Sequence, residues 1–499
     1  MTVMDDDGAT HSDTMTVTVK KVIIPNQTPI ANAGPDQNIT EGETVNLDAS
    51  SSYDPDGTIV SYEWSENGTA FANTALFSLP NLSVGEHTLQ VKVTDDDNNT
   101  DTDTLLVNVL AGTNEGVSFH TAFMNNYDST PDKLAFFISS KEDTIGEVTL
   151  TDTNETISFS VSAGDIEEVI IPTRMMLNGT GKVRRVVSIT SEKDIVVVGL
   201  NQLQYTTDAY LLLPDKLLGR EYYTVGYENI FNDEFALIAT EDNTIVNVTL
   251  ANSLGSFDVN LSKGEVYQYQ QNEELTASHI SSNKNIAVVS GNQCTDIPDG
   301  NYACDHIVEQ MLPVDTWEKE FITVPLKTRL NGDTFRVIAS QNNSDITIND
   351  TVVATLNAGE YYETILTTSS AISSNSPIMV AQYSNGSSFD GVTSDPFMAL
   401  VPATAQYDTT HIINTPSGFT DYINLVVPTA SVNDVQLDDG NIDVSEFTVV
   451  AGTNYSSAQL QISEGQHTVS SSAKIGLLGY GFADYDSYGY PSSLRVTKH

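Results

Sequence analysis

The stretch ITSEKDIVVVGLN, residues 189–201, decides the fold of most of this chain. Its apolar second half has the length of one β-strand, and the phrase returns 91 residues later as ISSNKNIAVVSGN at 280–292. A third copy, ISSNSPIMVAQYS, covers 372–384, and a weaker fourth, VSSSAKIGLLGY, covers 469–480. No helix-period segment of useful length follows residue 116, so the repetition predicts an all-β tandem array.

A second phrase recurs between these copies, at 135–144, 236–244, 335–344 and 424–431. Together the two phrases predict a domain at 116–499 with four β repeats of about eight short strands each, at about 117–219, 220–318, 319–408 and 409–499. Two arrangements fit, a β-propeller-like ring and a row of β-sandwiches. The ring is favoured, because residues 119–124 supply a first strand that the last repeat, ending near Leu494, could borrow.

The N-terminal part has a different organisation. Residues 26–110 alternate apolar and polar positions between turn residues, which is typical of an antiparallel sandwich. Residues 3–19 align without a gap on 93–109, 90 residues further on. We therefore expect residues 1–20 to be the C-terminal hairpin of a truncated module and 21–112 to be a complete one, with any export signal upstream.

This module resembles the PKD (polycystic kidney disease) domain. The matching words are ANAGPDQ at 31–37, LDASSSYDPDG at 47–57, YEW at 62–64 and VTDDD at 93–97, whereas SENG at 65–68 departs from the family pattern. The resemblance implies an immunoglobulin-like β-sandwich that serves as a spacer or adhesive module.

Five acidic residues of this module allow two interpretations. Carboxylates on neighbouring loops are possible calcium ligands, but Asp-Pro-Asp-Gly is also a turn in its own right. The turn interpretation is favoured, and calcium stays an alternative for Asp54, Asp56, Asp95, Asp96 and Asp97.

The composition excludes several classes of protein. The chain has 499 residues, 67 acidic and 21 basic, with a net charge of −46. Such a charge repels nucleic acid and anionic lipid. Hydrophobic residues make up 39%, enough for several cores, but the apolar runs have only strand length, so we expect no membrane insertion by this fragment.

The two cysteines, Cys294 and Cys304, lie in a turn-rich loop. A disulfide would close a ring of about ten residues. Zinc is disfavoured, because only His306 lies nearby as a further ligand. A disulfide requires an oxidising compartment, and several N-glycosylation triplets also favour an extracellular or cell-surface glycoprotein.

The C-terminal region resembles the N-terminal domain of the IgGFc-binding protein family. The matching words are YTTDAYLLLP at 205–214, LGREYY at 218–223, EFALIATEDNT at 234–244, SGNQC at 290–294, CDHIVEQ at 304–310 and NGDTF at 331–335. The resemblance runs from about 117 to 497 and implies a non-catalytic binding or adhesive domain. It identifies no residue that would contact an Fc fragment.

Asp208, Asp305 and Asp395 each precede a Leu-Pro or Val-Pro step, and Asp484 or Asp486 is the candidate fourth. Equivalent carboxylates around a ring would converge on a cation or on the hydroxyls of a ligand. Satisfaction of local backbone donors is the favoured alternative. The aromatic run 480–490 is interpreted as core packing rather than a sugar-stacking surface.

These patterns favour a non-catalytic extracellular adhesion protein whose PKD-like spacers present a β-rich head to a glycan or glycoprotein. Calcium is the one cofactor that remains open. The alternatives are a secreted polymer-degrading enzyme with PKD accessory domains and a structural surface-layer component. The sequence shows no nucleophile, phosphate-loop or zinc-protease motif for the enzyme.

Overall fold

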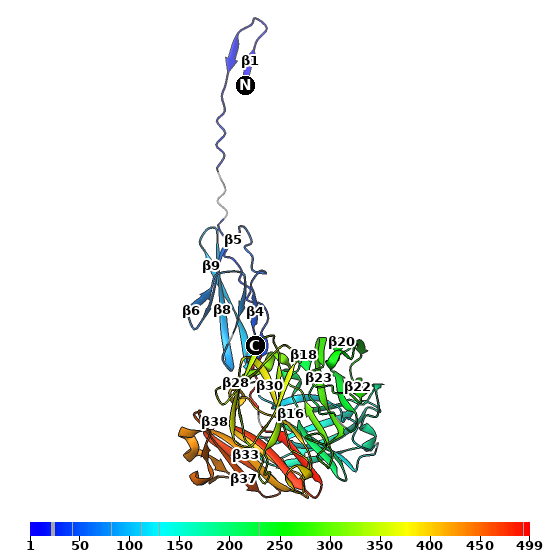
Figure 1. The fold of residues 1–499 in the computed structure, drawn as a ribbon. Coiled ribbons are helices and arrows are strands. Elements are labelled where there is room, and N and C mark those ends of the chain that lie inside the picture. The colour runs from blue at the N-terminus through cyan, green and yellow to red at the C-terminus, as the bar shows by residue number, and fades with distance from the viewer. Residues whose placement is uncertain are drawn as a thin grey trace. The chain divides into compact units, whose positions relative to one another are not determined.

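A computed structural model describes residues 1–20, 25–41, 43–80, 82–110, 112–128, 130–228, 230–492 and 494–499 (Figure 1). The chain divides into two compact units. The small unit holds Met1–Ile39 and Glu43–Leu110, and the large unit holds Thr40–Gly42 and Ala111–His499.

The small unit begins with an isolated hairpin and continues as two antiparallel sheets of order β3-β9-β8-β5-β6 and β4-β7. Both sheets bury apolar side chains around Trp64, which is fully buried and whose indole N–H donates to the carbonyl of Thr74 at 3.1 Å. The strands are β1 (Thr2–Met4), β2 (Thr10–Ser12), β3 (Gln37–Thr40), β4 (Val45–Asp48), β5 (Ile59–Glu66), β6 (Thr69–Ala72), β7 (Leu76–Leu79), β8 (Gly85–Asp95) and β9 (Thr100–Leu110).

The large unit contains four curled sheets, each built on one long strand. These strands are β16 (Val187–Leu203), β23 (His279–Thr295), β30 (Ser370–Tyr383) and β38 (Gly465–Ala483), and they carry the four copies of the repeated phrase. The first half of β16 pairs with β10 and β12, and its second half pairs with β11 and β17. The other three long strands divide between two sets of partners in the same way.

The remaining strands belong to the four sheets in chain order. The first sheet has β10 (Gly116–Thr121), β11 (Lys133–Ser139), β12 (Thr144–Leu150), β13 (Glu155–Val161), β14 (Ile166–Ile171) and β17 (Thr206–Leu211). The second has β15 (Gly181–Val183), β18 (Gly219–Tyr223), β19 (Asp233–Ala239), β20 (Thr244–Thr249), β21 (Ser256–Leu261), β22 (Val266–Gln271) and β24 (Asp305–Gln310). The third has β25 (Glu318–Thr323), β26 (Asp333–Ala339), β27 (Ser344–Ile348), β28 (Thr351–Leu356), β29 (Tyr361–Leu366) and β31 (Met398–Leu400). The fourth has β32 (Asp408–Thr415), β33 (Thr420–Pro428), β34 (Gln436–Leu437), β35 (Gly440–Asn441), β36 (Thr448–Val449), β37 (Tyr455–Ile462) and β39 (Asp486–Pro491).

The helices are all short. They are α1 (Ser387–Asp390) and the 3-10 turns η1 (Thr173–Met175), η2 (Asp215–Leu217), η3 (Ala251–Ser253), η4 (Val314–Thr316), η5 (Thr404–Gln406), η6 (Thr429–Asp434) and η7 (Val444–Glu446). No helix in the part of the chain that the structure describes has the length and apolar character needed to cross a membrane.

Burial along β16 follows from its sequence. Residues 187–194 place buried side chains on one face only, whereas every residue of 195–201 is buried. A strand covered on one face alternates apolar and polar residues, and a strand covered on both faces is continuously apolar. The change from SITSEKD to IVVVGL therefore marks the point where the strand passes from the outside of the unit into its interior.

The last strand of each sheet lies at the centre of the large unit. β17 lies against β24 and β39, and β31 lies against the same two strands. All residues of β17, β24 and β31 are buried. Four strands that are distant in sequence thus form one shared core.

The expected exchange of a first strand is not observed. β10 pairs with β16 of its own sheet. The first sheet has seven strands, and β16 is shared by two four-stranded sets of order β13-β12-β16-β10 and β14-β11-β16-β17. The ends of the large unit nevertheless pair, since Thr113 bridges Arg495 and the amide of Asn114 donates to the carbonyl of Leu494 at 3.0 Å. Counting strands in the sequence could not reveal this pairing, because one long strand belongs to both halves of each sheet.

Candidate ligand-binding site at the centre of the four sheets

Asp208 on β17 is the central polar residue of the large unit. It is completely buried, and its Oδ1 accepts the backbone N–H of Ala209 at 2.8 Å and of Gly489 at 3.3 Å. Its Oδ2 accepts the N–H of Val308 at 3.0 Å and of Met398 at 3.3 Å. These four donors lie on β17, β39, β24 and β31, so one carboxylate joins all four sheets. Burial raises the pKa of Asp208, and the four amides oppose this shift.

Three further carboxylates lie close to Asp208. Asp305 begins β24 and Asp486 begins β39, while Asp395 precedes β31. Burial and the charges of its acidic neighbours raise the pKa of Asp305 far above its usual range. Burial also raises the pKa of Asp395 to about 8 and of Asp486 to about 7. The structure therefore brings the three aspartates singled out from the sequence together, with Asp486 as the fourth.

These carboxylates also share polar contacts. The hydroxyl of Ser487 donates to the carbonyl of Asp395 at 2.8 Å and lies 3.5 Å from Oδ2 of Asp305. Thr207 donates to Oδ2 of Asp486 at 3.2 Å. Oδ1 of Asp395, by contrast, has no hydrogen-bond partner among the described residues, although the side chain is 99% buried. Local backbone donors thus satisfy Asp208, as the favoured interpretation expected, but not Asp395.

A pocket of about 380 Å³ opens beside Asp395, and aromatic rings form much of its wall. We call it the aromatic pocket. Its lining residues are Tyr127, Gln204, Tyr205, Thr206, Phe231, Cys294, Tyr302, Ala303, Cys304, Asp395 and Tyr485. A concave site with a few polar groups among aromatic side chains is the usual form of a ligand-binding site.

Two tyrosines of this pocket occupy strained backbone positions. Tyr205 lies in the turn between β16 and β17, and Tyr485 lies in the corresponding turn between β38 and β39. Their φ angles are 68° and 56°, in the left-handed region that favours glycine or asparagine. A bulky side chain there costs about 1–2 kcal/mol. Both side chains remain partly exposed, at 52% and 39%.

The predicted disulfide between Cys294 and Cys304 is present. It forms part of the pocket wall, and His306 lies just beyond it with no exposed surface. Nδ1 of His306 is 2.8 Å from the carbonyl of Asn292, and Nε2 is 3.3 Å from the side-chain amide of Asn201. Burial lowers the pKa of His306 to about 4, so this histidine is neutral and has a structural role.

The five acidic residues of the small unit lie on two neighbouring loops. A Cβ on Gly57 would lie 2.3 Å from Oδ2 of Asp54 and 2.3 Å from Oδ1 of Asp96, so the two carboxylates approach each other over this glycine. Asp95 accepts the amides of Asp97 and Asn99 at 2.9 and 2.7 Å, which is turn chemistry.

Burial raises the pKa of Asp54, whose Oδ2 has no described hydrogen-bond partner. Asp56 accepts the amide of Gln27 at 3.2 Å. No group of three or more His, Cys, Asp or Glu side chains within the described ranges is arranged to hold a metal ion. Calcium at Asp54, Asp56, Asp95, Asp96 and Asp97 stays a prediction.

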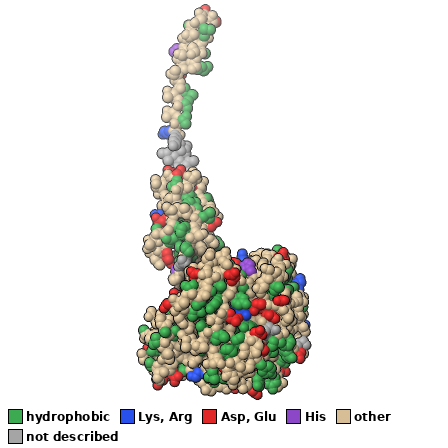
Figure 2. Space-filling view, viewed as in Figure 1, with side chains coloured by type: hydrophobic (Ala, Val, Ile, Leu, Met, Phe, Trp, Pro, Cys, Tyr) green, Lys and Arg blue, Asp and Glu red, His purple; other side chains and the backbone are tan. Residues whose placement is uncertain are grey.

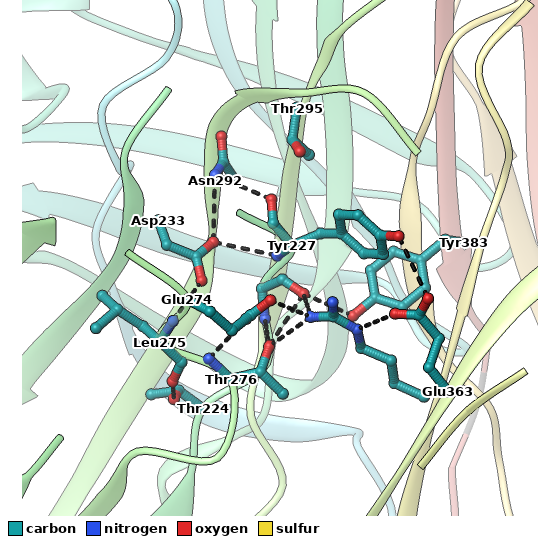
Figure 3. Close-up of polar contacts among 12 residues, drawn as sticks. Thr224, Tyr227, Asp233, Glu274, Leu275, Thr276, Asn292, Thr295, Glu363 and Tyr383 are labelled. Carbon is teal, nitrogen blue, oxygen red and sulfur yellow. Dashed lines mark hydrogen bonds and ion pairs between the residues drawn. The ribbon is translucent and has the colours of Figure 1, made fainter. Parts of the chain in front are cut away.

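A buried arginine connects the second and third sheets (Figure 3). Arg336 on β26 forms ion pairs with Glu274 and Glu363, each at 2.9 Å, and donates to the carbonyl of Gly226 at 2.8 Å. Its guanidinium lies over the ring of Tyr227 at 4.1 Å and over that of Tyr361 at 4.7 Å. The large unit thus holds one guanidinium between tyrosine rings and carboxylates.

The aromatic pocket was not predicted from the sequence. The run 480–490 was expected to be core, and Tyr480, Tyr488 and Tyr490 are indeed buried. Tyr485 of the same run is the exception. Its position in a two-residue hairpin turn is the one signal that would have identified it, because such turns favour glycine or asparagine there.

Comparisons with known proteins agree with both resemblances. The family model described as IgGFc binding protein matches residues 208–481, and the K319L-like PKD domain matches 33–109. The human IgGFc-binding protein is 27% identical over 395 residues, which cover 74% of this chain and 7% of that protein. The mouse dyslexia-associated protein KIAA0319 homolog is 36% identical over 124 residues, 23% of this chain and 11% of that protein.

Among solved structures, the PKD1 domain of Vibrio anguillarum Epp is 33% identical and covers 17% of this chain and 98% of that one, with a TM-score of 0.15. The chain spans only a small part of the length of its curated relatives, 7% of the human protein and 11% of the mouse protein. Since the first family model covers more than half of the chain, the chain belongs to the IgGFc-binding protein family and carries a K319L-like PKD domain before the family region.

Proposed function

We propose that this chain is a non-catalytic extracellular binding protein, in which the PKD-like module is a spacer and the large unit binds a protein or glycoprotein. The observation that carries the proposal is the aromatic pocket at the centre of the four sheets, with the buried carboxylate of Asp395 in its wall. The printed name of the human relative states that it binds IgG Fc. We extend to this chain only the class of ligand, an extracellular glycoprotein or its glycan.

A binding role fits the chemistry of the pocket better than a reaction does. Aromatic side chains supply contact area with little conformational entropy to lose, which suits recognition. His306 is the histidine nearest to the disulfide, and both of its ring nitrogens are already in polar contacts. Asp395 is the one carboxyl group among the described residues that line the pocket, so an acid–base mechanism that uses a paired acid and base would lack a second carboxyl group there.

The finer architecture belongs to the same proposal. The central contact of β17, β24, β31 and β39 and the pairing of Thr113 with Arg495 support a closed, propeller-like ring of the four repeats predicted at 117–219, 220–318, 319–408 and 409–499. The disulfide supports an oxidising, extracellular or cell-surface location.

The test is an array of extracellular glycoproteins and free glycans probed with the full chain, with IgG Fc in native and deglycosylated forms. We expect binding to at least one glycoprotein, and we expect Tyr205→Gly to weaken it. Asn154→Gly is the matched control, because Asn154 has a φ of 58° in a turn away from the pocket. Absence of binding to every glycoprotein and glycan would contradict the proposal.

The same array tests calcium. Loss of binding in EDTA, with recovery on adding calcium, would assign the ion to the acidic loops or to the central carboxylates Asp208, Asp305 and Asp395. Binding that is unchanged in EDTA would leave the loop residues with their turn role.

A further inference from the structure

We propose that the aromatic pocket binds one cationic side chain of the partner protein, with the ammonium or guanidinium group beside Asp395 and between the tyrosine rings. This inference rests on the proposed function, since it names the chemical group through which the ligand is held. The pocket volume of about 380 Å³ is sufficient to admit the end of one side chain.

The first observation is the unsatisfied carboxylate. Asp395 is 1% exposed and lines the pocket, yet its Oδ1 has no hydrogen-bond partner among the described residues. Burial raises the pKa of Asp395 to about 8, so without a ligand this group is a protonated carboxylic acid near neutral pH. A bound cation that brings positive charge and N–H donors would stabilise its ionised form.

The surrounding charges favour a cation as well. The nearby carboxylates that interact electrostatically with Asp395 are Asp486, Asp296 and Asp484, and the nearby cation is Arg329. Nη2 of Arg329 pairs with Asp390 at 3.0 Å and donates to the carbonyl of Asn385 at 2.7 Å, whereas its Nε and Nη1 have no hydrogen-bond partner among the described residues. The carboxyl groups that act on Asp395 therefore outnumber the basic groups.

The second observation is the arrangement of the rings. Tyr127 and Phe231 lie edge to face with centroids 5.0 Å apart, and Tyr302 and Tyr485 lie edge to face at 6.3 Å. Tyr127 and Tyr302 are 53% and 68% exposed. Faces of aromatic rings attract cations, most strongly where the cation also loses water.

The third observation is that the same large unit already uses this chemistry internally. The guanidinium of Arg336 lies over the rings of Tyr227 and Tyr361 and pairs with Glu274 and Glu363. Figure 3 shows Tyr227, Glu274 and Glu363 of this group. The aromatic pocket offers tyrosine rings and a carboxylate without an arginine among its lining residues. A cationic side chain from a partner would complete an equivalent arrangement.

The backbone strain at Tyr205 and Tyr485 is the fourth observation. Both tyrosines adopt positive φ in turns where glycine would be unstrained, and both line the pocket. Backbone strain of this kind is often concentrated at ligand-binding sites. The overall charge of −46, with acidic side chains spread over the visible face of the large unit, would also attract a basic partner (Figure 2).

The experiment uses the full chain and N-acetyl-arginine amide as the probe, followed by saturation-transfer NMR. N-acetyl-citrulline amide is the control, because it has nearly the same shape and no charge. We expect the arginine probe to bind at least about tenfold more tightly than the citrulline probe, and we expect Asp395→Asn to remove that difference. Equal binding of the two probes, or preferential binding of methyl glycosides, would overturn the proposal.

Tyr205→Gly separates a binding role from a structural one. Because glycine relieves the positive φ, this variant should unfold at a higher urea concentration while binding the arginine probe at least about fivefold more weakly. Asn154→Gly should leave the affinity unchanged. If Tyr205→Gly retains full affinity for the probe, the proposal is wrong.

Failure of this inference can be distinguished from failure of the proposed function. A chain that binds a glycoprotein on the array, and binds the arginine probe no better than the citrulline probe, would keep the proposed function and lose the cationic contact. A chain that binds the arginine probe selectively and binds nothing on the array would keep the cation site and lose the proposed ligand class.

Discussion

Replacing Asp208 by asparagine tests whether one carboxylate holds the four sheets together. Each of its oxygens accepts two backbone N–H groups, from Ala209 and Gly489 on one side and from Val308 and Met398 on the other. Asparagine keeps the shape but replaces one oxygen by an amino group, so two N–H groups lose their acceptor and face another donor. A hydrogen bond to a charged group contributes about 1.5–3 kcal/mol, so two of them amount to about 3–6 kcal/mol. The neutral amide costs less to bury, which offsets part of this loss, and we expect a net loss of about 3 kcal/mol.

The assay is urea unfolding of the full chain, followed by tryptophan fluorescence. Trp317 is 2% exposed and reports on the large unit, whereas Trp64 lies in the core of the small unit and should show an unchanged transition. Asp165→Asn, at an exposed turn, is the matched control. A loss below about 1 kcal/mol, or one no larger than that of the control, would refute the central role of Asp208.

Three further predictions concern stability. Arg336→Met should cost about 3 kcal/mol because it removes a buried guanidinium from its ion pair with Glu274 and from the carbonyl of Gly226. Arg174→Met, at an exposed ion pair, should cost less than about 1 kcal/mol; equal urea midpoints for the two variants would contradict this. Burial raises the pKa of Asp395 to about 8, so the folded chain keeps a proton that the unfolded chain releases above about pH 4. The free energy of unfolding should therefore fall as the pH rises from about 4 to 8, by up to about 1.4 kcal/mol per pH unit, with a flatter slope in Asp395→Asn; urea midpoints that rise over this range would disprove the assignment. Reducing the bond between Cys294 and Cys304 should lower the free energy of unfolding by about 2–3 kcal/mol and weaken binding of the arginine probe. An unchanged urea midpoint would contradict the first effect, and an unchanged probe affinity would contradict the second.

Much of the fold could be predicted from the sequence, because its signal is local and repeated. The four copies of one phrase became four long strands, and the change from alternating to continuous apolar residues within 187–201 marked where a strand enters the interior. The repeats also allowed the convergence of Asp208, Asp305 and Asp395 to be predicted, as the alternative to a purely local role for each carboxylate. Equivalent positions of a repeat approach one another wherever the repeats surround a common centre.

The pairing of the strands was harder to predict. The ring interpretation expected the last repeat to borrow residues 119–124 as a strand. In the structure β10 stays with β16, since one long strand supplies an edge to two sets of partners. Sequence periodicity shows which residues form a strand but not how many partners that strand accepts along its length.

The aromatic pocket could not be predicted because its residues come from separate loops. Tyr127, Tyr205, Tyr302 and Tyr485 lie up to several hundred positions apart and share no motif. Each one alone reads as an ordinary exposed tyrosine. The packing of the four sheets against one another brings them to one place beside Asp395.

The pairing of Thr113 with Arg495 has a mechanical consequence. In a longer polypeptide under tension, as on a surface exposed to flow, pulling force would enter and leave the large unit through these adjacent residues. The force would then act on the short antiparallel contact between Thr113 and Arg495, and the four sheets would not carry it.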